Sequence, residues 1–141
     1  AGGVKTLVDI LNRVDRSTER TILETLEQDD PELADEIRKR MFIFEDILTL
    51  DDNSIRRVLR EIDLKDLALA LKAASEEVAS RIYRNLSKRA GEMLREDIEY
   101  MGPARLRDVE EAQQRIVQTI RRLDESGEII IARGGEDTLV V

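Results

Sequence analysis

The stretch SKRAGEMLREDIEYMGPARLR, residues 87–107, carries the pattern that decides the fold of this chain. It predicts a charged helix over residues 87–101, a Gly-Pro break, and the start of a second charged helix. The first helix would be about 22 Å long at a rise of about 1.5 Å per residue. Its apolar residues recur at helical spacing and form one stripe: Ala90, Leu94, Ile98 and Met101.

The remaining face of this helix carries charges of both signs, and two interpretations are open. In the first, the face is solvated and holds weak pairs between residues four apart, each contributing roughly 0.2–0.5 kcal/mol. In the second, the face docks a charged partner. Spacing alone does not choose between them.

Composition excludes several classes of function. Charged residues make up 38% of the 141 residues and the net charge is −8, which argues against nucleic acid because phosphate binding needs a basic face. The absence of cysteine excludes disulfides and thiolate metal sites, and the absence of histidine removes the commonest general base. No segment approaches the roughly 20 apolar residues that cross a bilayer. The chain begins with Ala and shows no signal peptide, so we expect a cytosolic fragment.

Short amphipathic helices are expected along almost the whole chain, most of them introduced by a capping residue such as Asp30 before Pro31. The helix that ends near Gln28 is expected to bury Ile22 among its apolar residues. Two β-branched runs in the tail, residues 129–131 and 139–141, predict a hairpin or an extended strip. The expected helices cover residues 4–14, 18–28, 31–40, 45–50, 55–61, 63–72, 75–86, 87–101 and 105–125.

A weak repeat underlies these helices. The pattern of two apolar residues followed three positions later by a third occurs at Ile22, Val58 and Ile82, with irregular spacing. Short amphipathic helices with short turns predict an all-α fold, an armadillo-like right-handed helical stack whose edges bind other helices.

The motif Met41-Phe42-Ile43-Phe44 interrupts the helical pattern with four large apolar residues. Four such residues cannot all face one core from a regular helix. The motif is therefore a buried connector, or a hinge between two helical units. We expect an armadillo-like unit over residues 1–40 and a C-terminal domain over residues 41–141.

No constellation predicts catalysis. Adjacent carboxylates such as Glu96 and Asp97 diverge by about 100° on a helix and do not converge on one substrate atom. The run Gly134-Gly135 lacks the lysine and the strand–helix context of a phosphate loop. The run beginning at Asp51 lacks the glycine and the distant glutamate of a calcium loop. We expect no enzyme, no catalytic residue, no metal and no cofactor.

Four segments together resemble a known family: MFIFEDILTLDD, LALALK, RNLSKRAGEMLREDIEYMGPARLRDVEEAQ and GEIIIARGGEDT. From about Val4 to the end, the chain is similar to the C-terminal part of the flagellar motor switch protein FliG family. The resemblance implies a rotor component on which the stator pushes through the charged cytoplasmic loop of its protein MotA. It implies that Met41, Phe42, Ile43 and Phe44 form the hinge used in direction switching. The charges that it implies for torque are Lys72, Arg89, Glu96, Asp97 and Arg105.

The resemblance also implies further partners and a location. Residues before the hinge would stack on other FliG copies, at the cytoplasmic face of the inner membrane in the flagellar basal body. The family's Glu-His-Pro-Gln-Arg motif, its main contact with the switch protein FliM, is missing here, so FliM binding is in doubt. The alternative is a helical regulatory adaptor such as the cytosolic gating domain of a magnesium transporter, which needs acidic clusters converging on a metal.

Overall fold

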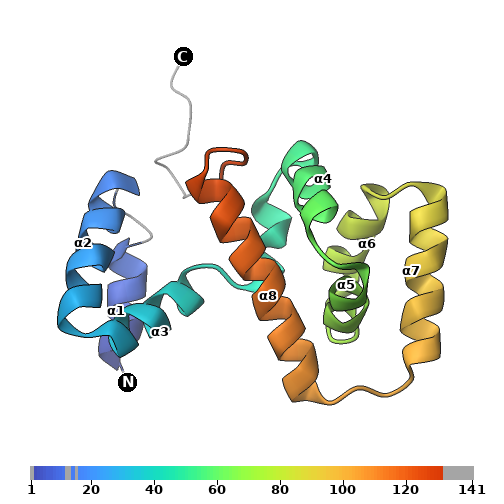
Figure 1. Ribbon diagram of the computed structural model, residues 1–141, viewed down its shortest axis with the longest axis horizontal. Coiled ribbons are helices and arrows are strands. Elements are labelled where there is room, and N and C mark those ends of the chain that lie inside the picture. The colour runs from blue at the N-terminus through green and yellow to red at the C-terminus, as the bar shows by residue number, and fades with distance from the viewer. Residues whose placement is uncertain (1, 12–13, 15, 132–141) are drawn as a thin grey trace. The chain divides into compact units, whose positions relative to one another are not determined.

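The computed structural model describes residues 2–11, 14 and 16–131, and these residues form helices joined by short turns (Figure 1). No strand occurs in the described part. The chain divides into two compact units, one containing the described residues up to Ile43 and the other Phe44–Ile131. The first unit contains α1 (Gly2–Leu11), α2 (Arg16–Asp29) and α3 (Pro31–Met41). The second contains the 3-10 helix η1 (Phe44–Thr49), α4 (Asp52–Glu61), α5 (Leu64–Leu71), α6 (Glu76–Arg84), α7 (Lys88–Met101) and α8 (Leu106–Glu125).

The first unit is built around α3, which packs against both α1 and α2. Its start was predicted correctly: the Asp30 carboxylate accepts a hydrogen bond from the Leu33 amide at 3.2 Å, and Pro31 is the first helical residue. The core of this unit is a cluster of buried aliphatic side chains from all three helices, Val8, Leu11, Leu23 and Ile37.

The prediction that Ile22 faces this core is wrong. Its exposed fraction is 37%, whereas that of its neighbour Leu23 is 5%. Successive residues on a helix point about 100° apart, so one of two neighbours can lie in the buried stripe while the other lies at its edge. The apolar stripe of α2 passes through Leu23 and Leu26 and leaves Ile22 at its border.

In the second unit, α5 lies between α7 and α8 (Figure 1) and packs against both. A helix enclosed on two sides needs small and aliphatic residues around most of its circumference. The sequence of α5 meets this need, because its fully or nearly buried residues include Leu67, Ala68, Ala70 and Leu71. The partner helix α8 buries a long stripe made of Val109, Ala112, Ile116, Val117, Ile120 and Leu123.

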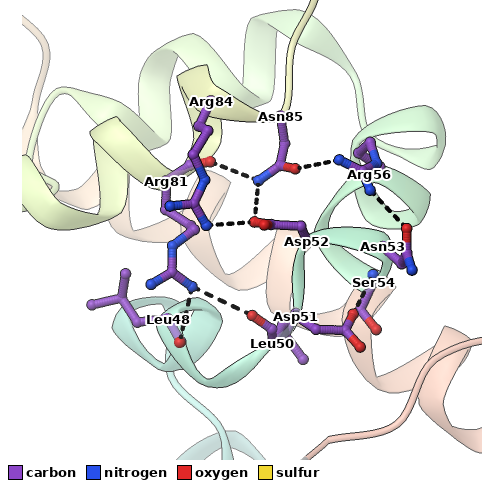
Figure 2. Close-up of polar contacts among 10 residues, drawn as sticks. All are labelled: Leu48, Leu50, Asp51, Asp52, Asn53, Ser54, Arg56, Arg81, Arg84 and Asn85. Atoms are coloured by element: carbon purple, nitrogen blue, oxygen red, sulfur yellow. Dashed lines mark hydrogen bonds and ion pairs between the residues drawn. The ribbon is translucent and has the colours of Figure 1, made fainter.

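A polar network fastens the start of α4 to the end of α6 (Figure 2). The Asp52 carboxylate accepts hydrogen bonds from Arg84 at 2.7 Å and from Asn85 at 3.0 Å. The Asn85 side chain also accepts a hydrogen bond from Arg56 at 3.1 Å. These bonds lower the pKa of Asp52, chiefly through Arg84 and then through Asn85.

The 3-10 helix η1 is held to α6 in the same region. Arg81 donates to the carbonyl oxygens of Leu48 and Leu50 at 3.3 and 3.5 Å (Figure 2). At the other end of η1, the Glu45 carboxylate accepts hydrogen bonds from the backbone amide and the hydroxyl of Ser75. The expected helical turn over residues 45–50 is therefore present as η1 and is fixed at both ends.

The Met41-Phe42-Ile43-Phe44 motif does not bury all four side chains. Phe42 and Phe44 are buried, Met41 is half-buried at the end of α3, and Ile43 is 48% exposed. Phe42 has extended backbone, with φ −144° and ψ 123°, which stops α3. The boundary between the two units falls inside this motif. Its role as a hinge, and the division of the chain into domains at residues 1–40 and 41–141, stay predictions.

The described part of the tail does not form a strand, but it alternates in burial. Ile129 and Ile131 are buried, whereas Ile130 is 73% exposed. The Ile131 amide donates to the buried Asp124 carboxylate at 3.4 Å, which anchors this segment to the end of α8. The second half of the predicted hairpin, residues 139–141, lies outside the described residues.

Candidate docking face

The five charges implied by the resemblance are all exposed: Lys72, Arg89, Glu96, Asp97 and Arg105. Lys72 is the C-cap of α5, the helix that packs against α7. Arg105 is the N-cap of α8, beyond the Gly-Pro break, and its side chain makes no capping bond. The other three charges lie on α7. Within the described part of the chain, none of the five side chains forms a hydrogen bond or ion pair.

Helix α7 presents its charges because both of its ends and its inner face are fixed. The Ser87 hydroxyl accepts a hydrogen bond from the Ala90 amide at 3.1 Å and starts the helix. Gly102, with φ 66°, ends it in a conformation that L side chains rarely adopt. Leu94 and Gly91 on the inner face are buried; α7 packs on α5, and Gly91 lies against the Tyr83 ring of α6.

The outer side of α7 carries more than charge. With 3.6 residues per turn, Arg89, Glu96 and Asp97 fall in an arc of about 100°, separate from the arc of Gly91 and Leu94. Met93 and Tyr100 lie in this outer arc too, with exposed fractions of 47% and 85%. We call these five residues the docking face: Arg89, Met93, Glu96, Asp97 and Tyr100. Sequence reasoning missed Met93 and Tyr100, although their spacing of four and eleven residues from Arg89 places them on the same side.

Some charges elsewhere in the second unit form ion pairs. Arg115 on α8 binds Asp66 on α5 at 2.9 Å. Arg57 binds Glu61 at 2.9 Å and Glu128 at 2.7 Å, and its hydrogen bonds lower the pKa of both carboxyls.

The charges of α7 also oppose the helix dipole. A helix is stabilised by acidic residues at its N-terminus and basic residues at its C-terminus, each by about 0.3–1 kcal/mol. Helices α3 and α6 obey this rule at both ends. Helix α7 has Lys88 and Arg89 in its first turn, no acidic residue there, and Glu99 rather than a basic residue in its last turn. Local stability therefore does not explain the order of charges on this helix.

Arg95 on α7 lies over an aromatic ring of α6. Its guanidinium carbon lies 4.7 Å from the centre of the Tyr83 ring on α6, at a distance typical of a cation–π contact. The same ring lies against Gly91, where an added Cβ would be 3.5 Å from a ring carbon. Partial burial of Tyr83 raises the pKa of its phenol.

Comparison with known families identifies the chain. The model of the FliG C-terminal domain matches residues 24–131. The chain belongs to this family. The family membership favours the motor interpretation over a magnesium transporter. In the described residues, no group of three or more acidic side chains is arranged to hold a metal ion, and no helix is long and apolar enough to cross a membrane.

Individual relatives agree with this assignment. The flagellar motor switch protein FliG of Thermotoga maritima is 60% identical over 99% of this chain and 42% of the relative. FliG of Bacillus subtilis is 56% identical over 99% of this chain and 41% of the relative. The solved structure of full-length FliG from Aquifex aeolicus matches with a TM-score of 0.85 and 37% identity, over 89% of this chain and 39% of that chain. The predicted all-α, armadillo-like fold is confirmed. The chain spans about two fifths of the length of these FliG relatives.

Proposed function

We propose that this FliG chain is a rotor and switch component of a bacterial flagellar motor. In this proposal, α7 and its neighbours receive torque from the charged cytoplasmic loop of the stator protein MotA. The contacting charges are Lys72, Arg89, Glu96, Asp97 and Arg105. The observation that supports the proposal is the set of exposed charges on α7 that pair with no described residue and oppose the helix dipole.

Weak contacts suit this task. A rotor must form and release each stator contact rapidly, so tight binding would slow its motion. Ion pairs between exposed side chains contribute only about 0–1 kcal/mol each. Complementary charges also orient an approaching partner more than they add affinity. A face with both signs of charge can attract one part of a stator loop and repel another.

The other proposed partners are those that membership of the FliG family implies. We propose that the first unit stacks on neighbouring FliG copies, and that the whole assembly lies at the cytoplasmic face of the inner membrane as part of the flagellar basal body. The family's main FliM-binding motif is absent from this chain, so binding of the switch protein FliM is not part of the proposal. The proposed role requires no catalytic residue and no cofactor.

Salt-dependent binding of the stator loop tests the proposal. The full-length protein is titrated with the labelled cytoplasmic loop of its own stator, at about 50 mM and about 500 mM salt. The affinity should fall steeply as salt is added. The distance over which exposed charges attract one another shrinks from above 10 Å to a few ångströms between the two salt concentrations. Arg89→Glu should weaken binding at low salt.

Arg60→Glu is the matched control. Arg60 is exposed on α4, outside the docking face, and its reversal changes the net charge by the same amount. It should leave the affinity for the loop nearly unchanged. Equal loss of affinity in the two variants would show that net charge, not the α7 site, controls binding, and the proposal would fail.

A further inference from the structure

A polar side chain, that of Gln113, lies within the apolar stripe of α8. Gln113 comes four residues after Val109 and four residues before Val117, so the three side chains point to the same side of the helix. Both valines are almost fully buried, and Gln113 is half-buried between them. Burying a polar group lowers stability unless the group forms a hydrogen bond. An amide at this position therefore needs a partner on a neighbouring helix.

That partner is a carbonyl group at the end of α5. The side-chain amide of Gln113 donates to the carbonyl oxygen of the fully buried Ala70 at 3.0 Å. The carbonyls on either side of it accept hydrogen bonds from the turn that follows α5, from the Lys72 amide to Leu69 at 3.1 Å and from the Ala74 amide to Leu71 at 3.3 Å. The last carbonyls of a helix have no partner inside it. Gln113 thus supplies from α8 a hydrogen bond that α5 does not supply itself.

The same turn of α8 also holds the other end of α5. Arg115, two residues after Gln113, donates two hydrogen bonds to the Asp66 carboxylate, at 3.1 and 2.9 Å. Asp66 belongs to the first turn of α5 and Ala70 to its last turn. Helix α5 is therefore fixed to α8 at two points, in addition to the apolar packing between the two helices. Sliding or rotation of α5 along α8 would break these hydrogen bonds.

The end of α5 that Gln113 holds carries an exposed cation. Lys72 is the C-cap of α5, two residues after Ala70, and its side chain is exposed. The last helical turn sets the direction of the Cα–Cβ bond at this position, so fraying of the turn would move the Lys72 cation. An apolar side chain at position 113 would fit the stripe of α8, but it would leave the Ala70 carbonyl without this donor. The amide therefore serves the end of α5 rather than the core.

We propose that Gln113 is a positioning residue for Lys72. Its hydrogen bond to Ala70 keeps the last turn of α5 closed and thereby sets where the Lys72 cation lies on the surface. Gln113 does not touch the partner itself and acts on it only through Lys72. This inference rests on the proposed function, because it takes Lys72 to be a contact of the stator loop.

Hydrogen exchange of backbone amides in the full-length protein tests the first step. Gln113→Met keeps the length of the side chain but removes the donor. The amides of Lys72 and Ala74 should then exchange about fivefold faster, which is the scale of one lost hydrogen bond. The amide of Val117, in the middle of α8, should keep its rate.

Gln114→Met is the matched control for the exchange measurement. Gln114 is also half-buried on α8, but its side chain forms no hydrogen bond with a residue that the structure describes. It should change none of the three exchange rates. Gln113→Asn is a second variant, which keeps an amide on a side chain that is one methylene shorter. It should lose the bond to Ala70 and give the same local change, and it takes the place of Gln113→Met if that variant does not fold.

Two results of the exchange measurement would overturn the proposal. Unchanged rates at Lys72 and Ala74 would show that Gln113 does not hold this turn. An equal rise in the rate at Val117 would show that Gln113 stabilises the core as a whole rather than the end of α5.

Binding of the stator loop at about 50 mM salt tests the second step. Lys72→Ala and Gln113→Met should each weaken binding about twofold to threefold, the scale of one exposed ion pair. The variant that carries both changes should bind no more weakly than Lys72→Ala, because Gln113 acts only through Lys72. In a protein that already carries Arg89→Ala, Gln113→Met should weaken binding by its full factor.

The outcomes of the binding experiment separate this inference from the proposed function. If Gln113→Met weakens binding by the same factor with and without Lys72, the positioning role is refuted and the proposed function stands. If neither Lys72→Ala nor Arg89→Ala weakens binding, or the unmodified protein binds no loop, the proposed function is refuted. The role of Gln113 toward the stator is then refuted with it, although faster exchange at Lys72 would still show that Gln113 holds the end of α5.

Discussion

Asp52 joins two helices through a single carboxylate. It accepts hydrogen bonds from Arg84 and Asn85 at the end of α6 while it opens the first turn of α4 (Figure 2). A carboxylate at this position is favourable for the dipole of α4 as well. Its charge is therefore part of what holds this end of the second unit together.

Replacing Asp52 should lower the stability of the folded chain by an amount that depends on pH. The folded state lowers the pKa of Asp52, so its contribution to stability is present above the ordinary pKa of about 4 and is lost as the pH falls through the lower, folded value. Asp52→Asn should lower the melting temperature at pH 7, and the difference should shrink as the pH falls from about 4 toward 2. Asp97→Asn, which removes a carboxylate without a described partner, should show no such loss at pH 7. A difference for Asp52→Asn that stays constant down to pH 2 would contradict this account.

The fold does not require glycine at position 91. A Cβ at this position would lie 3.5 Å from the Tyr83 ring, an ordinary contact distance, and the residue lies inside a helix. Gly91→Ala should therefore raise the free energy of unfolding by about 0.5–1 kcal/mol, as measured by urea denaturation.

Gly102→Ala provides the opposite case on the same helix. Nothing lies near a Cβ there, but φ is 66° and ψ is −160°, a conformation almost restricted to glycine. This substitution should lower the free energy of unfolding by about 1–3 kcal/mol. If Gly91→Ala destabilised the chain as much as Gly102→Ala, the packing described between α6 and α7 would be incorrect.

At the residue scale, the sequence predicts helix starts better than side-chain partners. The caps Asp30, Asp51, Asp63, Ser75 and Ser87 could be found because each acts on amides two or three residues away. The contact of Arg95 with Tyr83 could not be found, because it depends on how α6 and α7 pack. The burial of Gly91 was missed for the same reason, since glycine has no side chain to mark an apolar stripe.

At the element scale, α7 should gain stability when its charges are reversed. Arg89→Glu places an acid in the first turn, where it interacts favourably with the helix dipole, and should stabilise the chain by about 0.3–1 kcal/mol at low salt. Lys39→Glu on α3 is the matched reversal, because Lys39 lies at the end where a cation is favourable and pairs with Asp35 at 2.9 Å. It should destabilise the chain. Thermal melts of both variants at low salt measure the two changes in stability. If Arg89→Glu lowered the stability as much as Lys39→Glu does, the charges of α7 would serve its fold.

Periodicity predicted the elements because each helix carries one apolar stripe, as in the run from Val109 to Leu123 on α8. It could not decide how wide each buried stripe is. Ile22 was assigned to the core because it neighbours Leu23, and only the packing of α2 on one side leaves it exposed. The charged side of α7 was recognised from motifs, whereas the exposure of Met93 and Tyr100 on the same side is visible only in the structure.

At the scale of the whole molecule, the predicted hinge can be tested with spin labels. The chain has no cysteine, so labels attach only at introduced sites such as Glu24→Cys in the first unit and Gln118→Cys in the second. Replacing the buried Phe42 and Phe44 by leucine should shift or broaden the distribution of distances between the labels. Ile43→Leu is the control, because this side chain is largely exposed, and it should leave the distribution unchanged. Identical distributions in all three proteins would refute the hinge.

The central claim is that the charges of α7 serve a partner rather than the fold. Its most direct test is the full-length protein with Arg89→Glu and Asp97→Lys together, introduced into the motile bacterium and also purified for thermal melting. We expect rotation to be severely impaired while the melting temperature is unchanged or slightly higher, because the double reversal agrees better with the helix dipole. A melting temperature that falls in parallel with motility, or a motor that turns normally, would contradict the claim.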